Sequence, residues 1–300
     1  MSALTRGNAI VGGVPTVSLD IPISAVFLAL YIAGAALNIT IFIANKRRGH
    51  KFIISILLNG FCIIRILTCS MRMAWATHLT NSSIVVTAQV FNSAGIILIY
   101  IINLVFAQRI LRARQPAIGW LPPVGIFFKA LYICIVGSLI MGIVALALLV
   151  STTSPKTIAA CRDVQLASIT FLLVLTTLPL FFLAITYLLP ESPDKEEFGQ
   201  GTMAHKVIIV TLSTCLSITV AGYKAGAAWD VRPLTNPGWF DSKPAFYVFG
   251  FTLEIFILVL FIFTRVDRRF HIPDQCTQPG DYSRGVLRSS AGEESKSSGV

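Results

Sequence analysis

The fold is decided by long apolar stretches, and the clearest of them covers residues 135–150 with the sequence IVGSLIMGIVALALLV. It belongs to a larger apolar block, 124–150, whose only charged residue is Lys129. A helix needs about 20 apolar residues to cross roughly 30 Å of bilayer hydrocarbon, and this block is long enough. A transmembrane β-strand would alternate polar and apolar residues over about ten positions, which this stretch does not do. We therefore interpret the block as a transmembrane helix.

Six further blocks of the same kind occur along the chain of 300 residues. The seven blocks cover residues 23–44, 52–76, 83–107, 124–150, 165–189, 206–229 and 244–264. The whole chain is 55% hydrophobic and 13% charged, whereas about a quarter of the residues in a soluble domain are charged. This composition excludes an ordinary soluble domain. It predicts an all-α bundle of seven transmembrane helices over residues 23–264.

The distribution of Lys and Arg predicts the orientation of the bundle, because cytosolic loops retain more positive charge than outer loops. With the N-terminus outside, twelve of the 24 basic residues flank the spans on the cytosolic side: Lys46, Arg47, Arg48, Lys51, Arg109, Arg112, Arg114, Lys195, Lys206, Arg265, Arg268 and Arg269. Five flank the outer side: Arg6, Lys156, Arg162, Arg232 and Lys243. We therefore expect the N-terminus outside and the C-terminus in the cytosol.

Both ends of the chain are predicted to be tails. Residues 1–22 lack the basic start and short apolar core of a cleavable signal peptide, so we expect a short extracellular tail and a first span that acts as its own insertion signal. Residues 265–300 should form a cytosolic tail, in which the basic segment 265–273 lies along the inner leaflet and 280–300 is disordered. The net charge of +10 arises largely at the cytosolic helix ends. It predicts anionic lipid head groups as partners, and no nucleic acid.

Two modification sites and one cysteine pair are candidates. Asn81 begins an Asn-Ser-Ser sequon in the first outer loop and is a candidate for glycosylation, whereas the sequon at Asn38 lies inside the first span and is discounted. Cys276 follows the basic segment and is a candidate for palmitoylation, with a free thiol as the alternative. Cys161 is expected in an outer loop, where it either pairs with Cys69 or stays unpaired.

Charged residues inside the spans carry the most functional information, since each costs a few kcal/mol in hydrocarbon and rarely faces lipid. Arg65 and Glu254 lie near the middle of the second and seventh spans, at similar depth. Arg72 is seven residues beyond Arg65, on nearly the same helical face, and Lys224 lies toward the outer side of the sixth span. One hypothesis is an outer polar cavity, lined by these four residues, for an anionic or zwitterionic small molecule. The alternative is an Arg65–Glu254 ion pair that fixes helix register.

Enzymatic functions are poorly matched by this sequence, and we predict neither an enzyme nor a bound metal or cofactor. An intramembrane metalloenzyme needs histidines at reachable spacing, but His78 lies outside while His50, His205 and His271 belong to three separate cytosolic segments. A retinal protein would need a lysine in the middle of the seventh span, where Glu254 lies.

Four short motifs resemble a known family. They are GHKF at 49–52, FAQRILRA at 106–113, GW at 119–120 and, above all, RVDRRFHIP at 265–273. These motifs resemble an uncharacterised fungal family of seven-span membrane proteins, catalogued as a domain of unknown function. Some of its members are labelled family C-like G-protein-coupled receptors. The resemblance implies a receptor role with a G protein as partner.

Three classes of function remain open from the sequence. Seven spans and basic cytosolic loops favour a receptor-like sensor of a small molecule. The intramembrane charges would also suit a transporter of small molecules or lipids, although the unequal spans show no inverted repeat. A structural membrane protein without a ligand is the third class. In each case we expect the plasma membrane or another membrane of the secretory pathway.

Overall fold

The computed structural model describes residues 7–47, 52, 54–273 and 276–283. The long helices are α1 (Val17–Arg47), α2 (Ile54–Thr77), α3 (Ser82–Ala94), α4 (Ile97–Arg114), α6 (Pro122–Ser151), α7 (Pro155–Leu188), α8 (Met203–Trp229) and α10 (Leu253–Phe263). The short elements are α5 (Pro116–Gly119), the 3-10 turn η1 (Trp239–Asp241), α9 (Lys243–Tyr247), the π-helical turn η2 (Val248–Thr252) and α11 (Val266–Arg269). In this part of the chain the only paired extended backbone is an isolated bridge between Asn8 and Pro233.

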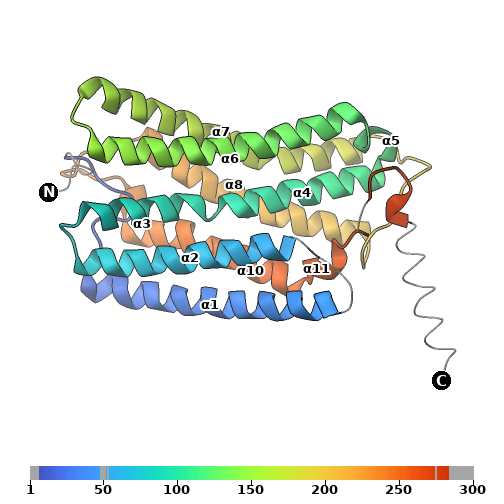
Figure 1. Ribbon diagram of the computed structural model, residues 1–300, viewed down its shortest axis with the longest axis horizontal. Helices are drawn as coiled ribbons and strands as arrows, with labels where there is room; N and C mark the ends of the chain where they lie inside the picture. The colour runs from blue at the N-terminus through green and yellow to red at the C-terminus, as the bar shows by residue number, and fades with distance from the viewer. Residues whose placement is uncertain (1–6, 48–51, 53, 274–275, 284–300) are drawn as a thin grey trace.

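The described helices form seven segments that are long and apolar enough to cross a membrane. Helices α3 and α4 together make the third segment, and α9, η2 and α10 make the seventh. The segments run roughly side by side, with α1 and α2 at one edge, α6 and α7 at the other, and α4 and α8 between them (Figure 1). We call the end that carries residues 7–16 the N-terminal end of the bundle, and the end that carries α11 its C-terminal end.

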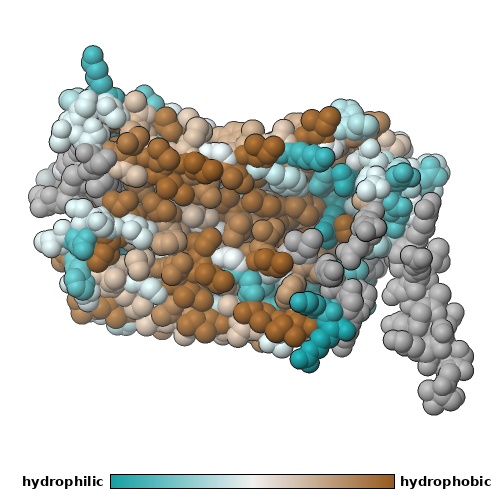
Figure 2. All heavy atoms as spheres, viewed as in Figure 1, coloured by the Kyte–Doolittle hydropathy of each residue, from teal (hydrophilic) through white to brown (hydrophobic). Residues whose placement is uncertain are grey.

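The sides of the bundle are apolar. Figure 2 shows hydrophobic side chains covering the middle of the visible face, with polar residues gathered toward the two ends. Ile133 of α6 is 72% exposed and Leu188 of α7 is 84% exposed, which suits lipid rather than water as the solvent. The chain is therefore a multi-pass integral membrane protein.

The third segment is interrupted at Gly95 and Ile96, between α3 and α4. Gly95 packs against the second span, where an added Cβ would lie 2.8 Å from Nε of Arg65 and 3.1 Å from its Cζ. Any side chain at position 95 would therefore have to displace the Arg65 guanidinium. The interruption brings the backbone of the third segment close to a buried charge.

The predicted boundary of the short N-terminal tail, residues 1–22, is six residues too late, because 17–22 belong to helix α1. Helix α1 begins at Val17, where the backbone N–H and the hydroxyl of Thr16 donate to the Asp20 carboxylate. The residues before it fold over the N-terminal end, since Ala9 N–H donates to Arg232 O (2.8 Å) and Gly12 N–H to Asp241 O (3.0 Å). Hydrogen bonds to a distant loop thus hold a segment that has little apolar character of its own.

The fifth span also begins earlier than predicted. Helix α7 starts at Pro155, ten residues before the predicted start at 165, with proline in the first turn. Proline suits this position because the first helical N–H groups have no partner within the helix. Cys161 therefore lies in α7 and not in an outer loop, and both Cys161 and Cys69 are buried free thiols. The predicted alternative of an outer disulfide between them is not formed.

The segment 265–273, predicted to lie along the inner leaflet, packs against the C-terminal end of the bundle. Phe270 is fully buried and stacks on Phe106 with ring centroids 4.0 Å apart, and its carbonyl accepts a hydrogen bond from Arg109. Asp267 accepts from Asn45 Nδ2 (2.7 Å) and from Arg265. Burial alone would raise the pKa of Asp267, but these hydrogen bonds outweigh it and hold the pKa below its ordinary value. The segment therefore closes the C-terminal end of the bundle.

The first part of the predicted disordered tail is also packed. The Glu196 carboxylate accepts from the backbone N–H groups of Gly280 (2.8 Å) and Tyr282 (2.9 Å). Tyr282 is 1% exposed and lies against Trp120 and Phe198. The prediction of disorder is thus wrong for residues 280–283, and its remainder, 284–300, lies outside the described residues.

Candidate functional site

Arg65 and Glu254 form an ion pair in the middle of the bundle. Both side chains are fully buried, and Nη2 of Arg65 donates to Oε1 of Glu254. The guanidinium also lies over the ring of Phe251, 5.5 Å from its centroid. This is the contact that the ion-pair hypothesis predicts. It connects α2 to α10 at the depth where an isolated charge would be most costly.

A π-helical turn directly precedes Glu254. In η2 the N–H of Leu253 donates to Val248 O, and the hydroxyl of Thr252 donates to Tyr247 O at 3.2 Å. The extra residue of a π turn changes the direction in which the following side chains point. The turn therefore contributes to the position of Glu254, and no periodicity in the sequence reveals it.

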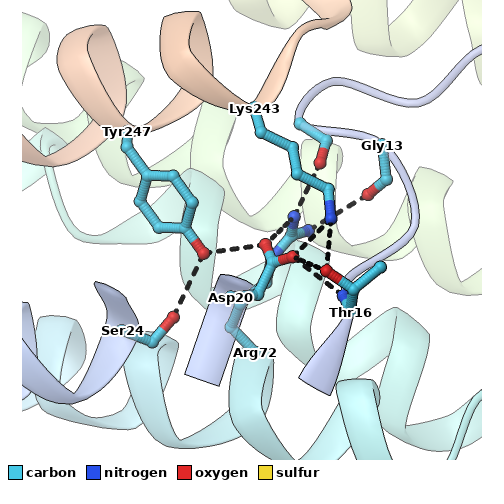
Figure 3. Close-up of polar contacts among 8 residues, drawn as sticks. Gly13, Thr16, Asp20, Ser24, Arg72, Lys243 and Tyr247 are labelled. Carbon is cyan, nitrogen blue, oxygen red and sulfur yellow. Dashed lines mark hydrogen bonds and ion pairs between the residues drawn. The ribbon is translucent and has the colours of Figure 1, made fainter. Parts of the chain in front are cut away.

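Arg72 belongs to a second polar cluster, centred on Asp20 at the N-terminal end (Figure 3). Asp20 Oδ1 accepts from Arg72 Nη2 and from the Tyr247 hydroxyl, both at 2.8 Å, and Oδ2 accepts from Lys243 Nζ at 2.6 Å. Asp20 is fully buried and Arg72 is 4% exposed. One carboxylate thus holds two basic side chains, and Arg72 is occupied by an ion pair.

The Asp20 cluster joins three separate parts of the chain. Arg72 Nη2 also donates to Gly12 O (2.7 Å) and Nη1 to Gly13 O (3.3 Å), so the same guanidinium holds the N-terminal segment. Asp20 was missed by sequence reasoning because it was assigned to the tail 1–22. The sequence pattern that could have identified Asp20 is an acidic residue four positions after Thr16, at the edge of an apolar block.

The main cavity of the bundle lies beside these clusters, in the N-terminal half, and has a volume of about 340 Å³. Helices α3, α4, α6, α7 and α8 line this partly open space, and Val11 of the N-terminal segment contributes to its wall. Lys224 is the only charged residue among those that line it. We call this space the Lys224 cavity.

Each helix presents one face to the Lys224 cavity. Helix α8 contributes Ala221 together with Lys224 and Ala228, which follow it by three and seven residues, and α6 contributes Gly142. The small side chains of Ala221, Ala228 and Gly142 make room for the cavity. An added Cβ on Gly142 would meet no heavy atom within 4 Å.

Two polar groups in the cavity are poised to bind. Lys224 Nζ donates to the backbone carbonyl of Asn92 at 2.9 Å, and Arg65 Nη1 reaches the same carbonyl at 3.5 Å. Ser168 is 5% exposed, and its Oγ has no hydrogen-bond partner within the described part of the chain. A buried hydroxyl without a partner is unfavourable by about 1–3 kcal/mol. A ligand in the cavity could satisfy it.

The structure thus divides the predicted set of four residues. Arg65 pairs with Glu254 and Arg72 pairs with Asp20, whereas Lys224 alone lines the cavity. The four residues therefore do not line one shared polar cavity. Arg65, Glu254 and Arg72 each pair with an oppositely charged side chain inside the bundle. Gln89, Ser93, Ser138, Gln165 and Ser168 supply the remaining polar lining, and sequence reasoning did not assign them to a site.

The two sequons lie in different surroundings. Asn81 is exposed at the N-cap of α3, where its Oδ1 accepts from the N–H groups of Ser83 (3.1 Å) and Ile84 (3.4 Å). Its glycosylation stays a prediction. Asn38 is buried and donates to Ser55 O at 2.8 Å, so its side chain serves helix packing. Palmitoylation of Cys276, which is partly buried and donates to Pro273 O, also stays a prediction.

The fold and the cavity define a multi-pass membrane protein with seven helical spans and an internal space beside one lysine. Residues 195–271 of the chain are similar to a family described as a protein of unknown function (DUF3112). The matched region includes both Lys224 and Glu254. No curated protein and no solved structure matches the chain.

Proposed function

We propose that this protein is a receptor-like sensor that binds a small molecule in the Lys224 cavity. The observation that carries the proposal is the cavity itself, about 340 Å³ in volume and lined mainly by apolar side chains around one lysine. Ligand sites typically have volumes of about 300–1,000 Å³, apolar walls and a few polar groups.

The surroundings of Lys224 support a sensing role. Its ammonium shares the Asn92 carbonyl with Arg65, at the interruption between α3 and α4. A ligand that draws the ammonium away would alter the hydrogen bonding at this interruption and, through Arg65, at the ion pair with Glu254. Occupation of the cavity would in this way change contacts among three spans. A ligand can shift a conformational equilibrium only if its contacts differ between the two conformations, and these contacts would differ.

The resemblance of this chain to an uncharacterised fungal family, some of whose members are labelled family C-like G-protein-coupled receptors, suggests the partner. We propose that the C-terminal end of the bundle faces the cytosol and contacts a G-protein α subunit. The role is not enzymatic, and the protein resides in the plasma membrane or another membrane of the secretory pathway. Ligand-dependent copurification of a G-protein α subunit is the test of coupling.

The orientation gives a separate prediction. Twelve basic residues near one side of the spans against five near the other favour an N-terminus outside and a C-terminus in the cytosol. A glycosylation reporter fused after Val300 should therefore stay unmodified, while the same reporter fused before Met1 should be modified. Modification of the C-terminal fusion alone would reverse the orientation.

Filling the cavity should weaken ligand binding while the protein stays folded. We expect Gly142→Leu to reduce the affinity for cavity ligands roughly fivefold to a hundredfold, the scale of overpacking by about 1–3 kcal/mol. The probes are octanoate, octanol and octylamine, which have nine or ten non-hydrogen atoms each. They suit the size of the cavity, since about 340 Å³ is roughly eleven times the volume that a water molecule occupies in the liquid. Binding is measured by equilibrium dialysis with the full-length protein in phosphatidylcholine nanodiscs.

Gly137→Leu is the matched control for this experiment. Gly137 lies on the same helix and also has open space around an added Cβ, but it does not line the cavity. Both variants gain helix propensity from the loss of glycine. If none of the three probes binds, or if Gly142→Leu binds them as well as Gly137→Leu, the cavity is not the ligand site and the proposal fails.

A transporter is the second candidate, and the interrupted third segment favours it. Transporter sites are often built from broken helices whose free carbonyls contact a substrate or ion, and the Asn92 carbonyl stands beside such a break. Uptake of radiolabelled octanoate into proteoliposomes separates the two functions. Flux that depends on the protein and is blocked by Gly142→Leu would favour transport, whereas binding without flux favours sensing.

A further inference from the structure

We infer that the Lys224 cavity is selective for an amphipathic monocarboxylate, an apolar chain of about eight carbons whose carboxylate binds Lys224. The inference rests on the proposed function, because it names the class of molecule that the cavity takes.

The charge balance around Lys224 favours an anion. Arg65 and Glu254 are the two charged groups that act on Lys224, and they are paired with each other. The ion pairs among the described residues do not include Lys224, whose ammonium donates only to the neutral carbonyl of Asn92. With Lys224 protonated, the group formed by Lys224, Arg65 and Glu254 carries one net positive charge beside the cavity. In a site of low polarity, a carboxylate is the group that balances it best.

The walls of the cavity favour an apolar chain. Leu139, Ile143 and Leu146 of α6 face Ile169 and Leu172 of α7 across the space. Burial of apolar surface contributes roughly 25 cal/mol per Å², so a chain placed between these residues adds affinity that a small inorganic anion would lack. The unpartnered hydroxyl of Ser168 offers a donor to the ligand.

The number of charges favours a single carboxylate. A phosphate monoester carries a charge of about −1.5 to −2 at neutral pH, which one lysine does not balance. A zwitterion would bring its own cation into the cavity, where no acidic residue lines the wall. The structure thus narrows the expected ligand from an anionic or zwitterionic molecule to a monoanion with an apolar tail.

The test compares the three eight-carbon probes on one protein. Full-length protein in phosphatidylcholine nanodiscs should bind octanoate at least tenfold more tightly than octanol or octylamine, since a charge-assisted hydrogen bond is worth roughly a tenfold to hundredfold change in affinity. Lys224→Met should reduce octanoate affinity by that factor and leave octanol affinity within about twofold. Lys224→Arg retains the charge and should preserve the preference for octanoate.

Lys129→Met is the matched control, because Lys129 is an exposed lysine on α6 away from the cavity. It should leave the affinity of every probe unchanged. A thermal melt of each variant establishes that the protein is folded. If Lys224→Met is not folded, two other results still decide the question: the preference of the unaltered protein and of Lys224→Arg for octanoate over octanol, and the weaker binding of octanoate by Gly142→Leu.

The outcomes separate this inference from the proposed function. Equal binding of octanoate and octanol, both lost in Gly142→Leu, would overturn the anion selectivity and leave the cavity as a ligand site. Absence of binding by every probe would overturn both. Competition of octanoate by phosphatidic acid in the nanodisc would indicate a lipid head group as the source of the anion, and would overturn the assignment to a free monocarboxylate.

Discussion

Glu254→Ala should lower the free energy of unfolding by about 3–5 kcal/mol, because it leaves the Arg65 guanidinium charged and unpaired in the middle of the bundle. Both side chains of this ion pair are fully buried. Around Arg65 the remaining partners are the Asn92 carbonyl, at 3.5 Å, and the aromatic rings of Phe61 and Phe251. None of them carries the negative charge that the pair requires. The measurement is an SDS titration of the purified protein in mixed micelles, followed by tryptophan fluorescence.

The control for this prediction is Glu191→Ala. Glu191 is 54% exposed and pairs with Lys195 and Arg114 near the C-terminal end, so its removal should leave the stability almost unchanged. The double variant Arg65→Met with Glu254→Leu removes both charges and should recover most of the stability. The charge swap Arg65→Glu with Glu254→Arg should recover only part, because the ring contacts of Arg65 are lost. If the double variants are no more stable than Glu254→Ala, the two residues do not act as a pair.

Asp20→Ala should be comparably destabilising, by about 3–5 kcal/mol, because it leaves Arg72 buried without a carboxylate. It also removes the acceptor of Lys243 Nζ and of the Tyr247 hydroxyl. Since Arg72 holds the carbonyls of Gly12 and Gly13, we expect the N-terminal segment to detach as well. Hydrogen exchange of the backbone amides of residues 7–16 should therefore accelerate in the variant, together with the loss of stability.

Asp230→Ala serves as the control for the Asp20 cluster. Asp230 pairs with Arg232 at the same end of the bundle, but both side chains are about half exposed (50% and 45%). An exposed pair contributes about 0–1 kcal/mol. If Asp20→Ala is as mild as Asp230→Ala, the cluster does not hold the N-terminal end of the bundle together.

The sequence alone determined the apolar architecture of this protein. Seven apolar blocks correspond to the seven candidate spans of the structure, because the thickness of the bilayer sets a minimum length that any sequence must satisfy. The contact between Arg65 and Glu254 was one of the two hypotheses drawn from the sequence, for a related reason. A charge in hydrocarbon needs a partner, and these two residues have opposite charge at similar depth.

Only the tertiary structure decided where the remaining polar groups go. Asp20 binds Lys243 and Tyr247, which are 223 and 227 residues away, and Asn45 binds Asp267 at a separation of 222. No local pattern specifies contacts of that range. For the same reason the sequence placed residues 7–22 and 265–273 outside the bundle, while hydrogen bonds to distant segments place them against its two ends.

The Lys224 cavity is likewise a property of packing and not of any single segment. Small side chains at Gly142, Ala221 and Ala228 permit it, but an empty space forms only where five helices leave one between them. The sequence determined that Lys224 lies within a span, since apolar length fixes depth. The sequence did not determine which of the four intramembrane charges stays without a counter-charge. That depends on how each helix is rotated about its axis, because the rotation decides which side chains meet.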